Sequence, residues 1–514
     1  MAERSAPAEL PVVVLSHRGP VSFTRQSGRR TVQRGGGGLV TALVGLAGRL
    51  TDAVWVCAAS TSEDVKVMRE NDDTAVGVVM QPQPHLATES DDDEQALQVR
   101  MVELDTQAHD DFYGVISNPL LWFLQHGMYG LSAAPNIDSA TRSAFFDGYL
   151  AVNEVFAAAV VEEVQARGGK ALVMLHDYHF YPVAGVVRRE CPDVVLSHFV
   201  HIPWPGPDGW RVLPPDLREP LLRGLLGNDV VAFHTEAFAR NFLLCAQELL
   251  QLPVDYERMT VQVGERTVAA RYYPISVDVD ALADMAASED VERNVRRMEE
   301  NLLAEGRKLI VRVDRTDPSK NIVRGFLAFE TLLEQHPELV GDVTFLAFLQ
   351  PSRQDVQEYA DYLARIGATV ARINARFAHE GHEPVDLRLQ EDLSTAMAAY
   401  AVCDVLLVNS LADGMNLVAK EAVTVSRRDG VLALSESTGA FEELGHFAVT
   451  LYPFDIQQQA DALWRALTMG PAERRDRRSA AAAVVAENHI GKWLATQLAD
   501  LTELTGLPIP SVEE

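Results

Sequence analysis

Two carboxylates bracket a tight turn late in the chain, in the segment DGMNLVAKE that runs from Asp413 to Glu421. The apolar run 405–408 before it predicts a buried parallel strand, and the residues after the turn have helical character. Gly414 and Asn416 allow the backbone to turn sharply, so that peptide N–H groups can point at a ligand. Carboxylates accept hydrogen bonds from sugar hydroxyls strongly and in fixed directions. The segment therefore predicts a site for a polyhydroxylated ligand.

Two cations follow an earlier apolar run, in the segment RTDPSK from Arg315 to Lys320. They leave the C-terminal end of the predicted strand 309–313, which is where doubly wound sheets bind ligands. An arginine offers a bidentate fork and a lysine a point charge, and together they suit a diphosphate. Such a pair could stabilise a nucleotide diphosphate as a leaving group. The alternative is a surface loop with ordinary solvated charges.

Four consecutive glycines occur between the first predicted strand and an apolar helix, in the segment RGGGGL at 34–39. Glycines at this place, Gly36 and Gly37 among them, allow the backbone to approach a phosphate closely, and a helix N-terminus adds a favourable dipole. The segment is neither a Walker loop nor GxGxxG. The alternative is a flexible turn.

Histidines and an aspartate follow two further predicted strands. The run 171–175 leads into His176-Asp177-Tyr178-His179, and the run 194–200 leads into His201 and a proline-fixed loop. Asp177 could bind a ligand or cap the next helix. Position at a strand end favours a site role for His201 over a core role. Two histidines three residues apart could ligate a metal, but no third ligand is evident, so no metal site is predicted.

The remaining candidates could bind a sugar phosphate. Arg18, Arg353 and the phenol of Tyr113 could hold a phosphomonoester, and the indole of Trp122 could stack on a sugar face. For Trp122 the alternative is an ordinary core position.

Short apolar runs that alternate with amphipathic segments must position these residues. Runs at 12–15, 54–57, 171–175, 194–200 and 230–233 predict one sheet, and runs at 309–313, 343–349 and 405–408 predict a second. Helical spacing at 144–166 and 321–335 completes βαβ units, so the expected class is α/β with parallel sheets. Hairpin strands are expected around 259–273.

The expected organisation is two Rossmann-like doubly wound domains that face each other across a ligand cleft. We expect residues 1–275 to form the N-terminal domain and residues 276–486 to form the C-terminal domain. Residues 487–514 are expected to form a helix, with Trp493, Leu494, Leu498 and Leu501 on its apolar face, that crosses back to the first domain.

Composition narrows the function classes. The 514 residues carry a net charge of −28, which argues against a nucleic-acid or anionic-membrane partner because both need a basic face. Four cysteines without a CxxC pair indicate neither a disulfide framework nor a zinc site, and a reducing cytoplasm is expected. No signal peptide is evident, and no segment was expected to approach the roughly 18 apolar residues of a membrane span.

Taken together, these motifs resemble the trehalose-6-phosphate synthases of glycosyltransferase family 20. These are retaining enzymes of the two-Rossmann GT-B type. The resemblance runs from about Val12 to the final helix and rests on six segments: DGMNLVAKE, HDYH, HIPWP, SNPLLW ending at Trp122, PSRQDV holding Arg353, and the RxDxxK-like spacing from Arg315 to Lys320. The wording VDRTDPSKN and PSRQDV is most similar to actinobacterial members.

The resemblance implies a donor site for UDP- or GDP-glucose, with the C-terminal domain on the donor side and the N-terminal domain on the acceptor side. It gives Arg315 and Lys320 the role of holding the diphosphate and stabilising it as it leaves, and Glu421 the role of binding the ribose. The glucose hydroxyls would contact Asp413 and the backbone of Met415, Asn416 and Leu417. The loop that contains Gly36 and Gly37 would close over the substrates.

The resemblance also implies an acceptor site for glucose 6-phosphate. Arg18, Tyr113 and Arg353 would grip the phosphate, with Trp122 beside it. Asp177 would contact the acceptor sugar, and His201 would contact the donor glucose near its C6 hydroxyl. With Arg315 and Lys320, these last two take the catalytic positions. The expected product is α,α-trehalose 6-phosphate, formed without a covalent enzyme intermediate, and neither a cofactor nor a metal is expected. The expected partners are these two small molecules, with a homo-oligomer left open.

Two positions depart from the family pattern, and alternatives remain. His17 stands where the family usually has Asn, and Ser276 where Gly is frequent. The donor base is read mainly by backbone around 388–392, so uracil and guanine both stay open. A relative that uses glycerol 3-phosphate or an amino-cyclitol phosphate as acceptor is one alternative. A non-catalytic sugar-phosphate sensor is another, although it predicts the loss of a site cation or carboxylate.

Overall fold

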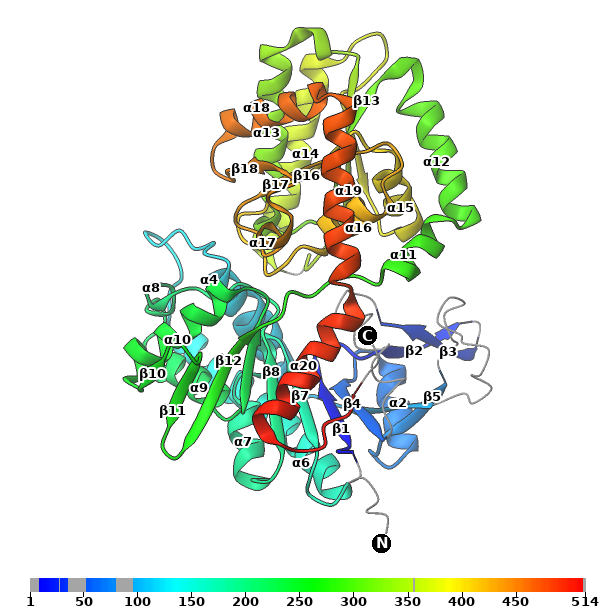
Figure 1. Cartoon of the computed structure of the whole chain (residues 1–514). Helices are drawn as coiled ribbons and strands as arrows, with labels where there is room; N and C mark the ends of the chain where they lie inside the picture. Colours follow the sequence, from blue (N-terminus) through cyan, green and yellow to red (C-terminus); the bar gives the residue numbers. More distant parts are fainter. Residues whose placement is uncertain (1–8, 27, 36–51, 80–95, 355, 512–514) are drawn as a thin grey trace, which may run out of the picture. The chain divides into compact units, whose positions relative to one another are not determined.

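The computed structural model describes residues 9–26, 28–35, 52–79, 96–354 and 356–511, which form two compact units. Unit 1 comprises Met1–Pro274 together with Ile490–Glu514, and unit 2 comprises Ile275–His489. Figure 1 colours the chain along its sequence, from the blue strands of unit 1 to its red C-terminal helix α20 (Ile490–Thr505). Each unit has its own sheet and its own core, as the alternation of apolar runs predicts.

The described part of unit 1 contains a 10-stranded sheet whose central strands are parallel. In spatial order the parallel strands are β6 (Ala96–Val102), β4 (Ala53–Ala58), β1 (Val12–Leu15), β7 (Leu172–His176), β8 (Val195–Phe199), β9 (Val230–Phe233) and β12 (Arg266–Tyr272). Antiparallel strands flank them: β5 (Val76–Val79) beside β6, and β11 (Thr260–Val263) and β10 (Val254–Asp255) beyond β12. The strands and the hairpin expected from the sequence are confirmed.

The order of these strands places a topological switch point between β1 and β7. From β1 the chain adds β4 and β6 on one side and then returns to add β7, β8 and β9 on the other. Leu15 at the end of β1 lies in register with Leu175 near the end of β7. Doubly wound sheets bind ligands beyond the carboxyl ends of the two strands at such a point. The residues that follow β1 and β7 are therefore the first to inspect in unit 1.

Helices cover the sheet of unit 1. The longer ones are α6 (Ala151–Ala166), α7 (Val183–Glu190), α9 (Pro215–Leu225) and α10 (Glu236–Leu250), with short α5 (Ser139–Ser143), α8 (Pro207–Trp210) and 3-10 turn η3 (Tyr178–Phe180). Helix α6 packs against β1, β4 and β6, and α10 packs against β9 and β12. Helix α20 docks on the same unit: Trp493 Nε1 donates to the Tyr273 carbonyl at 3.2 Å, and Arg271 pairs with Asp500 at 3.0 Å.

The helical segment Ser139–Ala166 is long and apolar enough to cross a membrane by length and composition. The expectation that no segment approaches such a span was too strict here. However, 61% of its most apolar 18-residue window is buried against the rest of the fold. Its apolar side chains are thus used in the core of unit 1.

A two-stranded hairpin follows β1 before the glycine-rich segment. It consists of β2 (Val21–Gln26) and β3 (Arg29–Arg34), and it packs on α2 (Ser62–Glu70). Gly35 follows β3 directly, and its N–H donates to the Pro20 carbonyl at 2.8 Å. Gly35 therefore follows a hairpin rather than the first strand of the sheet, which the sequence pattern did not predict.

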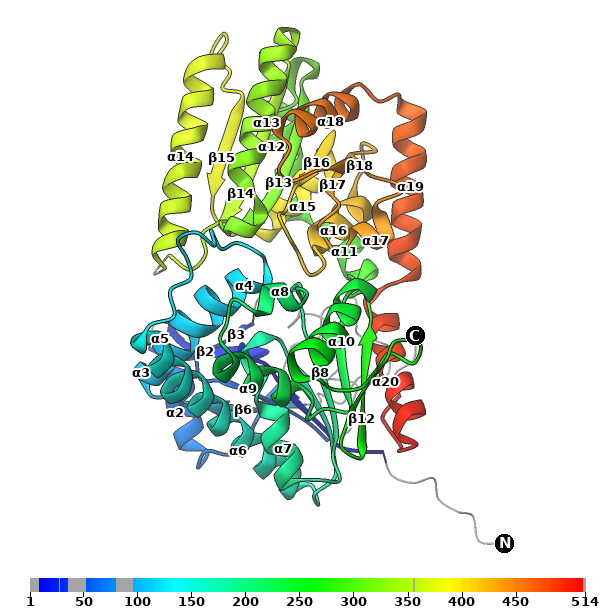
Figure 2. The ribbon, with the colours of Figure 1, turned by 90° about the vertical axis from the view of Figure 1, so that its left-hand side faces the viewer.

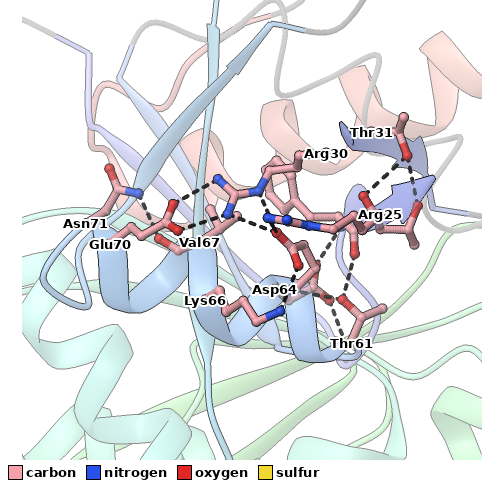
Figure 3. A network of polar contacts seen from close by, with 12 residues as sticks. Arg25, Arg30, Thr31, Thr61, Asp64, Lys66, Val67, Glu70 and Asn71 are labelled. Carbon is pink, nitrogen blue, oxygen red and sulfur yellow. Dashed lines mark hydrogen bonds and ion pairs between the residues drawn. The ribbon is translucent and has the colours of Figure 1, made fainter. Parts of the chain in front are cut away.

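A network of charges anchors this hairpin to α2 (Figure 3). The guanidinium of Arg30 contacts Glu63 at 3.0 Å and Glu70 at 2.8 Å, and Arg25 contacts Glu63 at 3.2 Å. Asp64 closes a capping box at the start of α2 and also accepts from a β2 N–H at 2.6 Å. Several charges act together here, so the network holds the base of the glycine-rich segment better than an isolated surface pair would.

The segment that carries Tyr113 and Trp122 is a π-helix, η1 (Asp110–Trp122), between α3 (Thr106–His109) and α4 (Phe123–Gln125). It packs against a second π-helix, η2 (Ala144–Leu150), that precedes α6. A Cβ on Gly148 would lie 2.4 Å from the Cβ of Asp111, so this glycine permits the close packing. π-helical turns are frequent at functional sites, and nothing in the sequence pattern predicts these two.

Unit 2 contains a six-stranded parallel sheet in the Rossmann order among its described residues. The spatial order is β15 (Val385–Leu389), β14 (Val343–Gln350), β13 (Lys308–Arg315), β16 (Val405–Val408), β17 (Val431–Ser435) and β18 (Val449–Leu451). The switch point lies between β13 and β16, and the three strands expected from the sequence are confirmed. The two segments that carry Arg315 to Lys320 and Asp413 to Glu421 follow these two strands.

Two helix layers cover this sheet (Figures 1 and 2). One layer holds α13 (Ile322–Gln335), α14 (Gln357–Phe377) and α18 (Ile456–Thr468); the other holds α11 (Val279–Ala286), α12 (Glu289–Asn301), α15 (Leu393–Val402), α16 (Leu417–Val425) and α19 (Pro471–Glu487). Short elements are α17 (Phe441–Leu444) and the 3-10 turns η4 (Ala304–Gly306), η5 (Pro318–Lys320) and η6 (Pro337–Leu339). The core between sheet and α13 centres on Phe326, Phe329 and Phe345, which are fully buried.

Candidate functional site

The switch point of unit 2 brings together residues from two separate motifs. Lys320 ends the 3-10 turn after β13, and Asp413 lies in the loop after β16. The ammonium Nζ of Lys320 lies 2.5 Å from Oδ2 of Asp413. The same carboxylate oxygen accepts from Ser410 Oγ at 3.3 Å and from Asn416 Nδ2 at 3.1 Å. The cation and the carboxylate that the sequence placed in one donor site are thus in direct contact.

The charges around Lys320 keep it protonated. Burial acts to lower the pKa of its ammonium, but the negative charges of Asp413 and Asp314 outweigh burial, so the pKa is raised above the ordinary lysine value. An ammonium carries three donors, and the bond to Asp413 occupies one of them. The group can therefore pair with this carboxylate and still contact an anionic ligand.

Arg315 and Arg353 both lie beside one buried carboxylate. Asp317 is fully buried, and its Oδ2 lies 3.9 Å from an Arg315 terminal nitrogen and 3.7 Å from an Arg353 terminal nitrogen. Tyr359 links the cluster, because its Oη donates to Asp317 at 3.1 Å and accepts from Arg353 at 2.6 Å. Arg353 has a left-handed backbone, with φ of 48°. It belongs to unit 2, whereas Arg18, Tyr113 and Trp122 belong to unit 1.

Asn416 and Gly439 determine the conformation of the turn after Asp413. Asn416 has φ of 82°, and its side chain caps α16 by accepting from the Ala419 N–H at 3.2 Å. Gly414 was expected to help by its conformational freedom, but it is Asn416 that takes the positive φ. A Cβ on Gly439 would lie 2.0 Å from the Gly414 carbonyl, so the loops after β16 and β17 meet backbone to backbone. Met415 is buried and Leu417 starts α16.

Glu421 on α16 is a carboxyl with a strongly altered acidity. Burial raises its pKa to about 7, although a hydrogen bond with Tyr400 acts in the opposite direction. Tyr400 lies on α15 and is buried, so it holds the carboxyl from the neighbouring helix. A carboxyl that titrates near neutral pH, at the C-terminal edge of a Rossmann sheet, is a candidate functional group.

In unit 1, His17 lies at the centre of a stack of aromatic rings, directly before Arg18 in the chain. His17 follows β1, and its imidazole stacks on Tyr113 at 4.8 Å, on His179 at 4.9 Å and on His109 at 5.9 Å between ring centroids. Burial lowers the pKa of His17 to about 3, so the ring is neutral at physiological pH. Arg18 is exposed at the end of the same strand. The residue that departs from the family pattern therefore packs directly on a predicted phosphate-binding phenol.

Asp177 has a strained backbone at the switch point. Its φ of 73° and ψ of 174° fall in a region used almost only by glycine, at a cost of about 1–3 kcal/mol. Its side chain makes no capping bond to the short helix η3, so the structure does not support the capping alternative. Instead Oδ1 lies 3.4 Å from the His201 N–H, and the Asp177 carbonyl accepts from His198 Nε2 at 3.0 Å. Strain held in place by neighbouring strands is typical of functional sites.

His201 is embedded among other rings. Its Nε2 lies 3.1 Å from His176 Nδ1, so one of the two imidazoles donates to the other, and it stacks on Phe199 at 4.5 Å. Burial and the nearby rings of His234, His176 and His198 hold the pKa of His201 well below its ordinary value. His176 faces His201 while His179 stacks on His17. Among the described residues no group of three metal-ligating side chains occurs.

Three further predicted positions are Trp122, Gly36 and Gly37. Trp122 is 7% exposed and packs on His126 at 4.1 Å and on Tyr178 at 5.6 Å, as in its core alternative. Gly36 and Gly37 lie outside the described residues, so their role stays a prediction.

Sequence reasoning missed three side chains that support the site: Tyr359, Tyr400 and Arg312. Tyr359 and Tyr400 lie at positions of α14 and α15 that the sequence pattern assigns to the apolar core. Their hydroxyl groups act through hydrogen bonds to Asp317 and Glu421, which are distant in the sequence. Arg312 left a signal, because a charged residue interrupts an apolar run that predicts a buried strand.

Comparisons with known proteins place the chain in a family. The family model described as glycosyltransferase family 20 matches residues 11–503. An α,α-trehalose-phosphate synthase [UDP-forming] from Schizosaccharomyces pombe is 33% identical over 90% of this chain and 85% of its own length.

Two solved structures agree with this match. A UDP-forming α,α-trehalose-phosphate synthase from Burkholderia xenovorans, in complex with glucose-6-phosphate, is 29% identical with a TM-score of 0.78. The match covers 96% of this chain and 100% of that one. An E. coli structure with bound UDP-2-fluoro glucose is 28% identical with a TM-score of 0.79, over 96% and 99% of the two chains. The two doubly wound units, the motif residues at their switch points and these matches agree, and the chain belongs to glycosyltransferase family 20, as a glycosyltransferase with the GT-B fold.

Proposed function

We propose that this enzyme transfers glucose from UDP-glucose to glucose 6-phosphate and forms α,α-trehalose 6-phosphate with retention at the anomeric carbon. The observation that carries the proposal is the Lys320–Asp413 contact beside Arg315 at the switch point of unit 2. It combines a diphosphate-binding cation and a hydroxyl-binding carboxylate in one place. The named substrates of the relatives, UDP-glucose analogues and glucose 6-phosphate, support the same reading.

In this proposal unit 2 provides the donor site. Arg315 and Lys320 bind the diphosphate and stabilise the negative charge that grows as the glycosidic C–O bond to phosphate breaks. Asp413 accepts hydrogen bonds from glucose hydroxyls, and the backbone of Met415, Asn416 and Leu417 adds donors at the start of α16. Glu421 accepts hydrogen bonds from the ribose hydroxyls.

Unit 1 provides acceptor groups. Arg18 and the Tyr113 phenol bind the phosphate of glucose 6-phosphate, and Asp177 binds a hydroxyl of the acceptor sugar. Arg353 is a further phosphate-binding residue in this proposal. His201 contacts the C6 hydroxyl of the donor glucose. The anomeric hydroxyl of the acceptor attacks from the face that the diphosphate leaves. The departing phosphate oxygen takes the proton of the attacking hydroxyl, so the products are UDP and α,α-trehalose 6-phosphate.

This chemistry matches what the site contains. A same-face mechanism needs phosphate-binding cations and requires no enzyme base with an adjacent nucleophile. The imidazoles of His17, His176 and His201 have lowered pKa values because of burial, so they enter as neutral hydrogen-bonding groups. We also propose a cytoplasmic location, because the four cysteines are buried free thiols and a reducing compartment keeps thiols in that state.

One experiment tests the function. Purified enzyme is given UDP-glucose or GDP-glucose together with glucose 6-phosphate, glycerol 3-phosphate or no acceptor, and nucleotide release and the disaccharide product are measured. The expected result is release that depends on glucose 6-phosphate, faster with UDP-glucose. Release that depends on glycerol 3-phosphate alone would reassign the acceptor, and no acceptor-dependent release would overturn the proposal.

A further inference from the structure

Arg312 is a charged residue in the middle of a buried parallel strand. It lies on β13 with neighbours β14 and β16 on either side, and its side chain is 0% exposed. Removing a guanidinium from water costs several kcal/mol unless its donors find partners inside the protein. Four hydrogen bonds provide those partners.

Two of these bonds end on the backbone that carries Lys320. A terminal nitrogen of Arg312 donates to the Lys320 carbonyl at 2.9 Å, and the other donates to the Ile322 carbonyl at 3.3 Å. The residue between them, Asn321, is left-handed with φ of 56°, so the chain turns sharply around the guanidinium. The Asn321 side chain is fixed in turn by bonds to the carbonyls of Asn409 at 3.0 Å and Pro453 at 2.6 Å.

The other two bonds end on Asp314. Arg312 donates from Nε at 3.1 Å and from a terminal nitrogen at 2.7 Å to the same carboxylate oxygen. Burial raises the pKa of Asp314, while the charges of Arg312 and Lys320 act to lower it. Asp314 is in turn one of the two carboxylates whose charge raises the pKa of Lys320. Arg312 therefore acts on Lys320 through its backbone and through a neighbouring charge.

Helix α13 leaves room for this guanidinium. A Cβ on Gly325 would lie 2.6 Å from an Arg312 terminal nitrogen and 3.3 Å from the Asn409 side-chain amide. A glycine in a helix lowers helix stability relative to alanine. The fold accepts that cost where a helix and a buried arginine meet beneath the donor site.

We propose that Arg312 is a positioning residue that holds the Lys320 ammonium where the leaving diphosphate needs it. The inference rests on the role of Lys320 in the proposed function. A displacement of about 1 Å in a catalytic group can reduce turnover about a hundredfold. Loss of Arg312 therefore lowers kcat by about 10- to 100-fold and leaves the KM for the sugar phosphate nearly unchanged.

A double-mutant cycle separates positioning from general stability. Arg312→Met, Lys320→Ala and the double variant are compared in steady-state nucleotide release, with thermal unfolding of each. If Arg312 acts through Lys320, the double variant has the turnover of Lys320→Ala alone. Losses that multiply, or an Arg312→Met variant with normal kcat, would overturn the inference.

Two further variants keep the test decisive. Arg474→Met is the matched control: this arginine of α19 also bonds backbone carbonyls and a carboxylate, Asp404, away from the candidate site. It is expected to lower the melting temperature but not kcat. If Arg312→Met does not fold, Gly325→Ala presses on the same guanidinium and is expected to lower kcat, again without effect in the Lys320→Ala background. Normal kcat in Gly325→Ala would then overturn the inference. Absence of wild-type turnover would instead refute the proposed function.

Discussion

The raised pKa of Glu421 predicts that the affinity of the enzyme for the nucleotide sugar changes with pH near pH 7. In the free enzyme the carboxyl is protonated below its pKa of about 7 and ionised above it. An ionised carboxylate accepts hydrogen bonds from ribose hydroxyls more strongly than the neutral acid does. The raised pKa of Glu421 places its ionisation near pH 7 instead of near the ordinary glutamate value. Because the ionised form binds the ribose more strongly, the affinity rises as the pH rises through this range and falls as the pH falls.

The size of the effect follows from the difference between charged and neutral hydrogen bonds. Bonds to a charged group contribute about 1.5–3 kcal/mol and neutral bonds about 0.5–1.5 kcal/mol, so the difference between the centres of the two ranges gives about 1.3 kcal/mol for the ionisation of Glu421. That difference is about tenfold in the dissociation constant. We therefore expect the Kd to fall by somewhat less than tenfold between pH 5.5 and pH 8.5, with half of the change in free energy about half a pH unit below 7, because binding lowers the pKa of the carboxyl by about one unit.

Calorimetry with UDP-glucose, without acceptor, measures this dependence. UDP-glucose is preferred to UDP because each of its phosphates has one ester link and one shared anhydride link, so each keeps a single charge over this range, whereas the terminal phosphate of UDP titrates within it. Glu421→Gln should give a flat profile, and Tyr400→Phe should move the midpoint to higher pH because the bond to Tyr400 lowers the pKa of Glu421. The exposed Glu334→Gln serves as the matched control and should keep the wild-type profile. A flat wild-type profile, or an unchanged slope in Glu421→Gln, would refute the reasoning.

Three further predictions concern the same unit. Arg315→Ala and Lys320→Ala should each lower kcat about 100-fold or more, the scale for losing a group that stabilises developing charge, and near-normal nucleotide release in either would refute its assignment. Arg353→Ala should chiefly raise the KM for the sugar phosphate; an unchanged KM, with Arg353→Lys as the comparison, would place the phosphate elsewhere. Gly439→Ala forces a Cβ to within 2.0 Å of the Gly414 carbonyl, so it should cost about 1–3 kcal/mol in chemical denaturation and weaken UDP-glucose binding; wild-type values for both would contradict this packing.

The eight apolar runs predicted as strands could be recognised because each lies in a parallel part of a sheet and is buried there. Such strands read as continuous apolar runs, as at Val12–Leu15 and Val405–Val408, and they need no long-range information to be recognised. The candidate residues could be listed for a related reason. Doubly wound sheets bind ligands at strand ends, so polar residues directly after an apolar run, such as Arg315 and His201, stand out.

Irregular elements were not predictable. The π-helix that carries Tyr113 and the hairpin before the glycine run follow from packing and from ion pairs such as Arg30–Glu70, which join residues 40 positions apart. The positive φ at Asp177 is likewise imposed by its neighbours, since local preference opposes it.

What the sequence determined by itself was the set of chemical groups and the sheet edges at which they stand. What only the tertiary structure decided was which groups meet. Lys320 and Asp413 are 93 residues apart and come into contact because β13 and β16 are neighbours at the switch point. The acidity of Glu421 and the support of Lys320 by Arg312 depend in the same way on burial and on partners from other elements. Charge–charge energies and desolvation are set by distance and surroundings in three dimensions, and a linear sequence does not contain them.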